Sequence, residues 1–372
     1  MRKTVLFTFI VFGILPSFLV ACKEKKSTLS EEKNIELNEE SVSAFGVQIE
    51  NSVMAFNPDF FNRAFDKAYI RNVISDNSIV YSSLDTDFGQ AYFESNFKMG
   101  NDAMEVVENG GDFKFVRYYE KEGESHIIMR TYRDYTIVID DYIVDTSGSA
   151  LKIKDGFNYN LSTDFSNQVR YNVFFNVMNR THPEGDTRLL LTVRSLLTDG
   201  NAREARRLLE ENKTALESYP YYLQYYIQSV YETDKDHYIR LLGQLEEEGF
   251  DHRSVLLHML LFYVHQGMPS EAEKVIDELI TYTGDDPIYL FMFGVANFNA
   301  GQYETALYCY ENAASGMPMI WDIWYGKLEC LAKMERSTEF RETLNEGEKA
   351  YNMSPYELEE LAKRNFPGIL TD

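Results

Sequence analysis

Cysteine and basic side chains are scarce in this chain, and each shortage excludes a class of protein. Three cysteines in 372 residues are too few for a disulfide framework. The chain has 36 Lys and Arg against 59 Asp and Glu, which gives a net charge of −23. That balance argues against nucleic acid as a partner and against docking on anionic lipid headgroups, because both need a basic surface. We therefore expect no nucleic acid among the partners.

Motifs with a recognisable chemistry are missing as well. The sequence has no Gly-rich phosphate loop, no Gly-x-Ser-x-Gly nucleophile elbow and no His-Glu-x-x-His. His252, His258 and His265 are six and seven residues apart, which does not fit a zinc site, so we interpret them as ordinary helix residues. The sequence therefore predicts no metal site, no cofactor and no catalytic residue.

An export signal is present at the start of the chain. Arg2 and Lys3 precede the apolar run Val5–Leu15, which is too short to span a bilayer comfortably. The run Leu19-Val20-Ala21-Cys22 closes the segment and resembles the lipobox of bacterial lipoproteins. The resemblance implies a signal peptide over residues 1–21 and a Cys22 that carries acyl chains such as palmitate. Several acyl chains anchor a protein firmly, because each buried methylene contributes about 0.8 kcal/mol.

The same resemblance implies a location in the bacterial cell envelope. No aspartate follows Cys22, which under the enterobacterial rule favours the outer membrane. In other bacterial groups a charged stretch at this place directs export to the cell surface, so the face of the membrane stays open. The alternative to lipidation is a soluble exported protein with a chance cysteine at its cleavage site. Residues 22–40 are polar and lack aromatic side chains, which predicts a flexible tether.

Residues 41–164 show the pattern of an α+β domain. Helical periodicity over 45–56, 61–70 and 85–107 precedes four β-type runs, Phe113–Tyr119, His126–Tyr132, Thr136–Val144 and Ala150–Leu161. Helices followed by such a meander predict helices packed on one face of a four-stranded antiparallel sheet. The order of elements resembles the cystatin-like cone of the nuclear-transport-factor-like superfamily. A bridging helix is expected within residues 165–185.

Some cones of that superfamily hold a small molecule, with a carboxylate or histidine inside. Asp140, Asp141 and His126 are the candidates for such a role here. The alternative is structural, since one of two adjacent aspartates on a strand usually faces solvent and a histidine often opens a strand.

Residues 186–372 repeat a helical pattern with a fixed period. Gly267 and Gly301 are 34 residues apart, as are Ala272 and Ala306, and this is the period of tetratricopeptide (TPR) repeats. Residues 287–320 resemble that family at Leu290, Phe293, Gly294, Gly301, Tyr303, Ala306, Tyr310, Ala313 and Pro318. The resemblance implies an all-α TPR solenoid that ends in a capping helix. It also implies that Gly294 and Ala306 let two helices approach closely.

In that family the first helix of each repeat lines a concave groove. The family's pattern assigns to the groove Tyr221, Gln228, Tyr231, Leu257, Leu261, Phe291, Val295 and Phe298. These side chains are mainly apolar and aromatic, and the basic clamp that holds carboxylate-ended peptides in some members is missing. One interpretation is that a partner peptide or helix lies in the groove. The other is that the chain covers the groove itself, with the bridging helix or the cone-like domain.

These patterns predict a membrane-anchored, non-enzymatic interaction scaffold that binds a protein or peptide partner in the cell envelope. The alternative is a ligand-binding or enzymatic lipoprotein with a small-molecule pocket in the cone-like domain. The sequence leaves open the identity of the partner and the oligomeric state. It also leaves open whether Cys309 and Cys330 pair or pack as small core residues.

Overall fold

The computed structural model describes residues 36–75, 84–181, 185–217 and 219–369, so Cys22 and the signal peptide lie outside the described residues. The chain divides into two compact units. Unit 1 comprises Met1–Met104, Tyr118–Ile127 and Asp141–Leu241, and unit 2 comprises Glu105–Arg117, Ile128–Asp140 and Leu242–Asp372. Each unit therefore combines segments of strands with helices from other parts of the chain. The domains expected from the sequence, 41–164 and 186–372, are instead continuous stretches of the chain.

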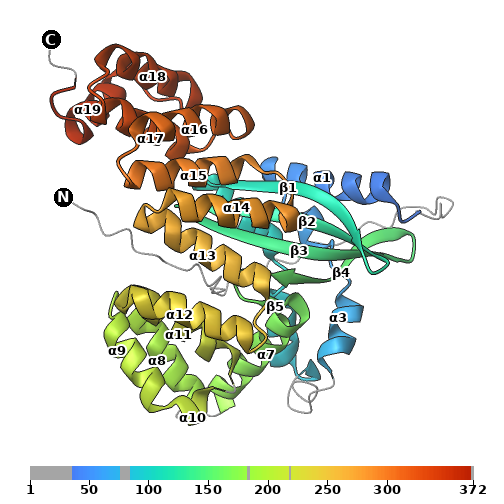
Figure 1. The fold of residues 1–372 in the computed structure, drawn as a ribbon. Coiled ribbons are helices and arrows are strands. Elements are labelled where there is room, and N and C mark those ends of the chain that lie inside the picture. Colours follow the sequence, from blue (N-terminus) through green and yellow to red (C-terminus); the bar gives the residue numbers. More distant parts are fainter. Residues whose placement is uncertain (1–35, 76–83, 182–184, 218, 370–372) are drawn as a thin grey trace. The chain divides into compact units, whose positions relative to one another are not determined.

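Consecutive strands form a five-stranded sheet in the order β1-β2-β3-β4-β5 (Figure 1). They are β1 (Asp112–Lys121), β2 (Glu124–Arg133), β3 (Thr136–Ser147), β4 (Ala150–Asn158) and β5 (Thr163–Asp164). Neighbours joined by tight turns run antiparallel, as the pairing of Phe157 with Asp164 shows. The prediction of four strands is wrong, because the fourth run ends at Asn158. The chain then turns, with Ser162 at a φ of 50°, and returns as a fifth strand.

Helices precede the sheet, as the sequence predicts. They are α1 (Glu39–Met54), α2 (Asp59–Asn62), α3 (Lys67–Ile74), α5 (Asp87–Ser95) and α6 (Met99–Glu108). The predicted periodicity is confirmed at Phe45, Ile49 and Val53, which α1 buries, but it is wrong at Phe56, which follows the end of the helix and is exposed. The continuous helices expected over 61–70 and 85–107 are both wrong. Residues 63–66 separate α2 from α3. Asn96 ends α5, its side-chain amide donating to the Tyr92 carbonyl at 2.7 Å, and the buried Phe97 then turns into the core.

Aromatic side chains form the core where unit 1 joins its strands to α7 (Phe165–Thr181). The ring centroid of Phe65 lies 4.7 Å from that of Phe165 and 5.8 Å from those of Phe97 and Tyr142. Asp155 on β4 holds the start of α7, accepting from the backbone N–H of Ser166 at 2.9 Å and from its hydroxyl at 2.6 Å. The helix expected at the start of 165–185 is therefore present and fastened to the sheet.

Further helices of unit 1 are α8 (Asp186–Thr198), α9 (Ala202–Glu211), α10 (Lys213–Leu216) and α11 (Pro220–Thr233). Their common core contains Leu190, Val193, Ala205, Leu209 and Tyr225. The next helix, α12 (Lys235–Glu247), begins in unit 1 and ends in unit 2, since the division falls between Leu241 and Leu242.

Helical hairpins succeed one another in unit 2 (Figure 1). The pairs are α13 (His252–Gln266) with α14 (Pro269–Thr283), α15 (Pro287–Asn299) with α16 (Tyr303–Gly316), and α17 (Trp321–Lys333) with α18 (Ser337–Ala350), followed by α19 (Pro355–Asn365). The turn of each pair contains a residue with positive φ, 64° at Gly267, 79° at Gly301 and 59° at Glu335. These residues lie 34 apart, so the predicted helical repeat is confirmed and extends to a third hairpin whose turn lacks glycine.

Tight contacts join neighbouring helices of this array. A Cβ on Gly294 of α15 would lie 2.7 Å from the Tyr310 ring of α16, and a Cβ on Gly326 of α17 would lie equally close to that ring. Ala306 is fully buried.

Cys309 and Cys330 are free, buried thiols whose pKa values burial raises to about 11 and about 12. The two cysteines therefore act as small core residues with little thiolate at neutral pH.

Candidate functional site

The predicted groove residues lie on α11, α13 and α15, and most of their side chains are buried. The exposed fractions are 0% at Leu257 and Phe291, 3% at Leu261, 6% at Val295, and 7% at Gln228 and Tyr231. Tyr221 and Phe298 are half-buried. These side chains are not free to receive a partner in this structure. Contacts within each unit show which strands or helices cover the side chains of Phe291 and Tyr221.

In unit 2 the β2–β3 hairpin covers Phe291 of α15. The ring of Tyr132 meets the Phe291 ring edge-on, with centroids 5.5 Å apart. Tyr135, from the turn between the strands, stacks on the same ring at 6.0 Å with an interplanar angle of 21°. Two tyrosines of the sheet therefore occupy the place at Phe291 that the family's pattern assigns to a partner.

Polar contacts hold these strands and helices of unit 2 together. Arg130 on β2 is 1% exposed, and its Nε donates to Asp286 Oδ2 at 3.1 Å while its Nη1 lies 2.7 Å from Asp112 Oδ2. The Tyr132 hydroxyl donates to Asp322 of α17 at 2.6 Å. Burial of Tyr132, with the nearby Asp322 carboxylate, raises the pKa of this hydroxyl well above its usual value, so it stays a donor.

The tip of the β2–β3 hairpin has a strained backbone. Asp134 and Tyr135 have φ values of 49° and 61°, as in a type I′ turn, although this turn normally selects asparagine and glycine. A bulky residue with positive φ is uncommon because its Cβ crowds the backbone. This conformation places the Tyr135 ring against that of Phe291.

In unit 1, α7 covers Tyr221 of α11. The Tyr221 hydroxyl donates to the side-chain oxygen of Asn172, and the ring meets Phe175 edge-on with centroids 5.3 Å apart. Tyr231, near the other end of α11, has the Nζ of Lys235 3.2 Å from its ring centroid. Of the two interpretations of the groove, the structure thus favours self-coverage at Phe291 and Tyr221, by the sheet and by the bridging helix respectively.

His126 and Asp141, two candidates from the sequence, meet in unit 1. His126 Nδ1 lies 2.9 Å from Asp141 Oδ1, and the side chains are 8% and 3% exposed. Tyr119, which sequence reasoning missed, stacks on the His126 ring with centroids 4.7 Å apart and donates its hydroxyl proton to Asp141. The three residues come from adjacent strands, so only the pairing register would have revealed the cluster. Asp140 is half-buried beside them in sequence.

This cluster contains part of what acid–base catalysis requires. A carboxylate on one imidazole nitrogen fixes the tautomer of the ring, as in hydrolytic triads. Within the part of the chain that the structure describes, however, no serine, threonine or cysteine hydrogen-bonds to His126. Nor do the described residues contain a group of three or more His, Cys, Asp or Glu that could hold a metal.

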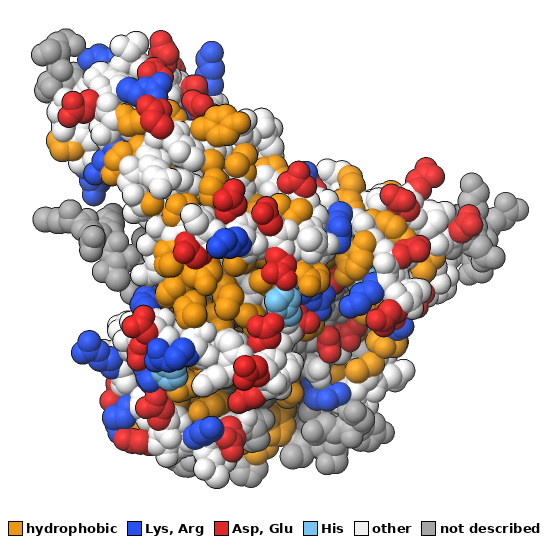
Figure 2. All heavy atoms as spheres, in the orientation of Figure 1, with side chains coloured by type: hydrophobic (Ala, Val, Ile, Leu, Met, Phe, Trp, Pro, Cys, Tyr) orange, Lys and Arg blue, Asp and Glu red, His pale blue; other side chains and the backbone are white. Residues whose placement is uncertain are grey.

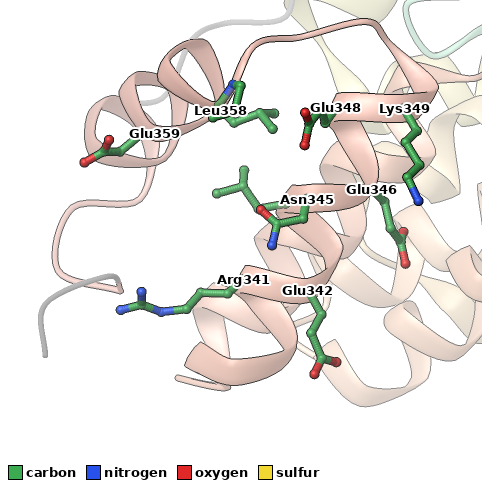
Figure 3. A pocket seen from close by; sticks show the side chains of 10 residues that line it. Arg341, Glu342, Asn345, Glu346, Glu348, Lys349, Leu358 and Glu359 are labelled. Carbon is green, nitrogen blue, oxygen red and sulfur yellow. The ribbon is translucent and has the colours of Figure 1, made fainter.

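A cleft of about 630 Å³ opens between α18 and α19 of unit 2 (Figure 3). Its lining contains more carboxylates than basic groups, namely Glu342, Glu346, Glu348 and Glu359 against Arg341 and Lys349. Acidic and basic side chains are interspersed on the face of α18 and α19 visible in Figure 2. Such an open, charged cleft suits polar contact with a macromolecule better than enclosure of an apolar ligand.

Comparisons with known proteins find little that is similar. No family model matches the chain, and no curated protein matches it. One solved structure with similarity is the crystal structure of the APC/C hetero-tetramer Cut9-Hcn1. The match has 17% sequence identity, covers 54% of this chain and 40% of that chain, and has a TM-score of 0.36. A likeness that is this distant carries no argument about function.

Proposed function

We propose that this chain is a membrane-anchored, non-enzymatic scaffold that binds a protein or peptide partner in the bacterial cell envelope, at the outer membrane. The observation that carries the proposal is the series of hairpins from α13 to α18, closed by α19. Stacked hairpins present a long surface of helices, which suits recognition of an extended chain or another helix. The lipobox at Leu19-Val20-Ala21-Cys22 supports the location. No helix among the described residues is long and apolar enough to cross a membrane.

The recognition surface that we propose differs from the predicted groove, since the chain covers Phe291 itself. In the described part of unit 2, the exposed large apolar side chains are Tyr308 on α16, Met319 before α17 and Tyr356 on α19, with exposed fractions of 64%, 61% and 71%. Exposed tyrosines beside interspersed charges are typical of binding hot spots. The partner therefore contacts the outer surface of the array at these residues.

The test is crosslinking in intact envelopes followed by capture of the full chain. We expect the double variant Tyr308→Ser plus Tyr356→Ser to keep the parent's thermal stability, because both side chains are exposed. It should lose most of the crosslinked partner, since a hot-spot residue typically contributes about 2 kcal/mol, roughly thirty-fold in affinity.

Leu37→Ser, which removes an exposed apolar side chain outside unit 2, serves as the control for that experiment. A double variant that folds normally and retains every crosslinked species would contradict the proposed surface. Deletion of 186–372 is less informative, because it would expose Arg130 and Tyr132, which residues of that segment bury.

A second candidate function is favoured by the cluster of Tyr119, His126 and Asp141. A buried imidazole held by a carboxylate would suit proton transfer to a small molecule bound at the sheet. His126→Gln then abolishes binding or turnover of that ligand and leaves partner capture unchanged. If His126→Gln instead leaves ligand binding and turnover unchanged and lowers partner capture, the scaffold function is supported.

A further inference from the structure

Exposed large apolar side chains are concentrated at the beginning of the described chain. Leu37, Val47, Met54 and Phe56 have exposed fractions of 37%, 43%, 40% and 56%. All four lie on α1 or within two residues of its ends. The opposite face of α1 buries Val42, Phe45, Ile49 and Val53 in unit 1, so the core does not use the outward apolar residues of this 16-residue helix.

The exposed residues of α1 beyond its first turn carry no charge. Its exposed residues from position 44 to position 57 are Ala44, Val47, Gln48, Asn51, Met54, Ala55, Phe56 and Asn57. Val47 and Met54 are seven residues apart, two helical turns, and so lie on one stripe. In a chain of which 26% is charged, a solvated helix face normally contains Asp, Glu, Lys or Arg. Glu39 and Glu40 lie in the first turn of α1, and Glu50, the third acidic residue of this helix, is half-buried.

Phe56 is held outward by an unfavourable backbone conformation. It follows α1 with a φ of 55°, and the N–H of Asn57 donates to the Ser52 carbonyl at 2.8 Å. Helices that end in this way usually place glycine at the left-handed position, because a side chain there crowds the backbone. The Phe56 ring is nevertheless 56% exposed, so burial within the chain does not offset the strain. Strain of this kind is a reason to look for a contact that the isolated chain lacks.

We propose that the outward face of α1 lies on the surface of a lipid bilayer, with Val47, Met54 and Phe56 among the acyl chains at the interface. The inference rests on the proposed anchor at Cys22. Glu39 is 17 residues after Cys22, a length of chain that reaches at most about 60 Å, so α1 is the first described helix after the anchor. Anchoring raises the effective concentration of α1 at the bilayer, so a small apolar face suffices.

The charge of the molecule favours this type of contact over an electrostatic one. The chain carries −23, so anionic headgroups repel it, and the exposed apolar residues of α1 are the part that lipid can accept. Interfacial helices bind through their buried apolar area, and lipid composition changes that binding. The contact should therefore resist salt and weaken as the share of anionic lipid rises.

The experiment uses residues 22–372 with an N-terminal hexahistidine tag on phosphatidylcholine vesicles that contain a nickel-chelating lipid. The variant Phe56→Trp is compared with the parent, whose own tryptophans give the background. Brominated phosphatidylcholine should quench the added fluorescence of Phe56→Trp by roughly twofold or more if the side chain enters the interface. Tyr356→Trp is the matched control, because Tyr356 is a 71% exposed aromatic residue on α19.

Two further variants sharpen the result. Met54→Glu in the Phe56→Trp background should abolish the added quenching, whereas Met319→Glu in that background should leave it unchanged. Equal quenching of Phe56→Trp and Tyr356→Trp would overturn the inference, and so would loss of the quenching in high salt. The chelating lipid replaces the acyl chains in this assay, so its outcome is independent of whether Cys22 is lipidated in the cell.

Discussion

At the scale of single residues, Gly294 controls how closely α15 and α16 approach. A Cβ at this position would lie 2.7 Å from a ring carbon of Tyr310 and 3.0 Å from the Cβ of Cys309. Tyr310 cannot move away easily, because Gly326 of α17 presses on the other side of its ring. The resemblance of 287–320 to the repeat family predicts this close approach, and the packing gives its physical reason.

We expect Gly294→Ala to lower the free energy of unfolding by roughly 1–3 kcal/mol, because the added methyl group overpacks a buried contact. Gly243→Ala on α12 is the matched control. Nothing lies within 4 Å of a Cβ there, so this change should stabilise the chain by about 0.5–1 kcal/mol through helix propensity. Urea denaturation of both variants measures the difference. Equal shifts in the same direction would show that α15 and α16 are not tightly packed.

At the scale of elements, Arg130 links β2 to the start of α15. Asp286 accepts from Arg130 Nε at 3.1 Å and from the Ile288 N–H at 2.8 Å, so one carboxylate pairs with the strand and caps the helix. Asp112 of β1 lies 2.7 Å from the same guanidinium. Asp112 and Arg130 are more than 150 residues before Asp286, a separation over which sequence patterns give no indication of pairing.

Arg130→Met should lower the free energy of unfolding by roughly 3–5 kcal/mol, because it leaves the buried Asp286 carboxylate without its cation. Adding Asp286→Asn should recover part of the loss, since the amide carries no charge and still caps α15. Chemical denaturation of the two variants gives the comparison. If Arg130→Met is as stable as the parent, the ion pair does not hold the strand to the helix.

At the scale of the whole molecule, the proposed anchor decides where the chain is found. Removal of residues 1–21 takes away Arg2 and Lys3 and changes the net charge from −23 to −25, so electrostatics oppose membrane attachment. The apolar face of α1 is small and needs the anchor to stay near the bilayer. Under the proposed anchor, we therefore expect retention in the membrane fraction to depend on the acyl chains.

Cys22→Ala should move the chain from the membrane fraction to the soluble fraction of fractionated cells, because several acyl chains contribute nearly all of the binding. Mass spectrometry of the parent's mature amino terminus should find the acyl mass on Cys22. A wash in high salt, which strips proteins held by charge, should leave the parent bound. Membrane retention of Cys22→Ala together with an unmodified terminus in the parent would rule out lipidation.

Local patterns in the sequence predicted the elements that depend on nearby residues. Periodicity identified α1, the alternation of Ile137 and Ile139 indicated a strand, and the 34-residue spacing of Gly267 and Gly301 predicted the hairpins. The errors occurred where a single residue acts through hydrogen bonds or backbone geometry. Asn96 ends α5 within an otherwise helical pattern, and Ser162 turns the chain into a short fifth strand.

The sequence by itself determined that helices precede a sheet and that a helical array follows it, as well as the repeat period and the acidic charge, because these follow from residues close together in the chain. Only the tertiary structure decided that Tyr132 and Tyr135 cover Phe291, that Asn172 meets Tyr221, and that Tyr119, His126 and Asp141 form one cluster. A periodic pattern shows which side chains are apolar, but each of them can be buried by any complementary surface. Which surface does so depends on strand register and helix packing, and therefore on contacts between residues far apart in the sequence.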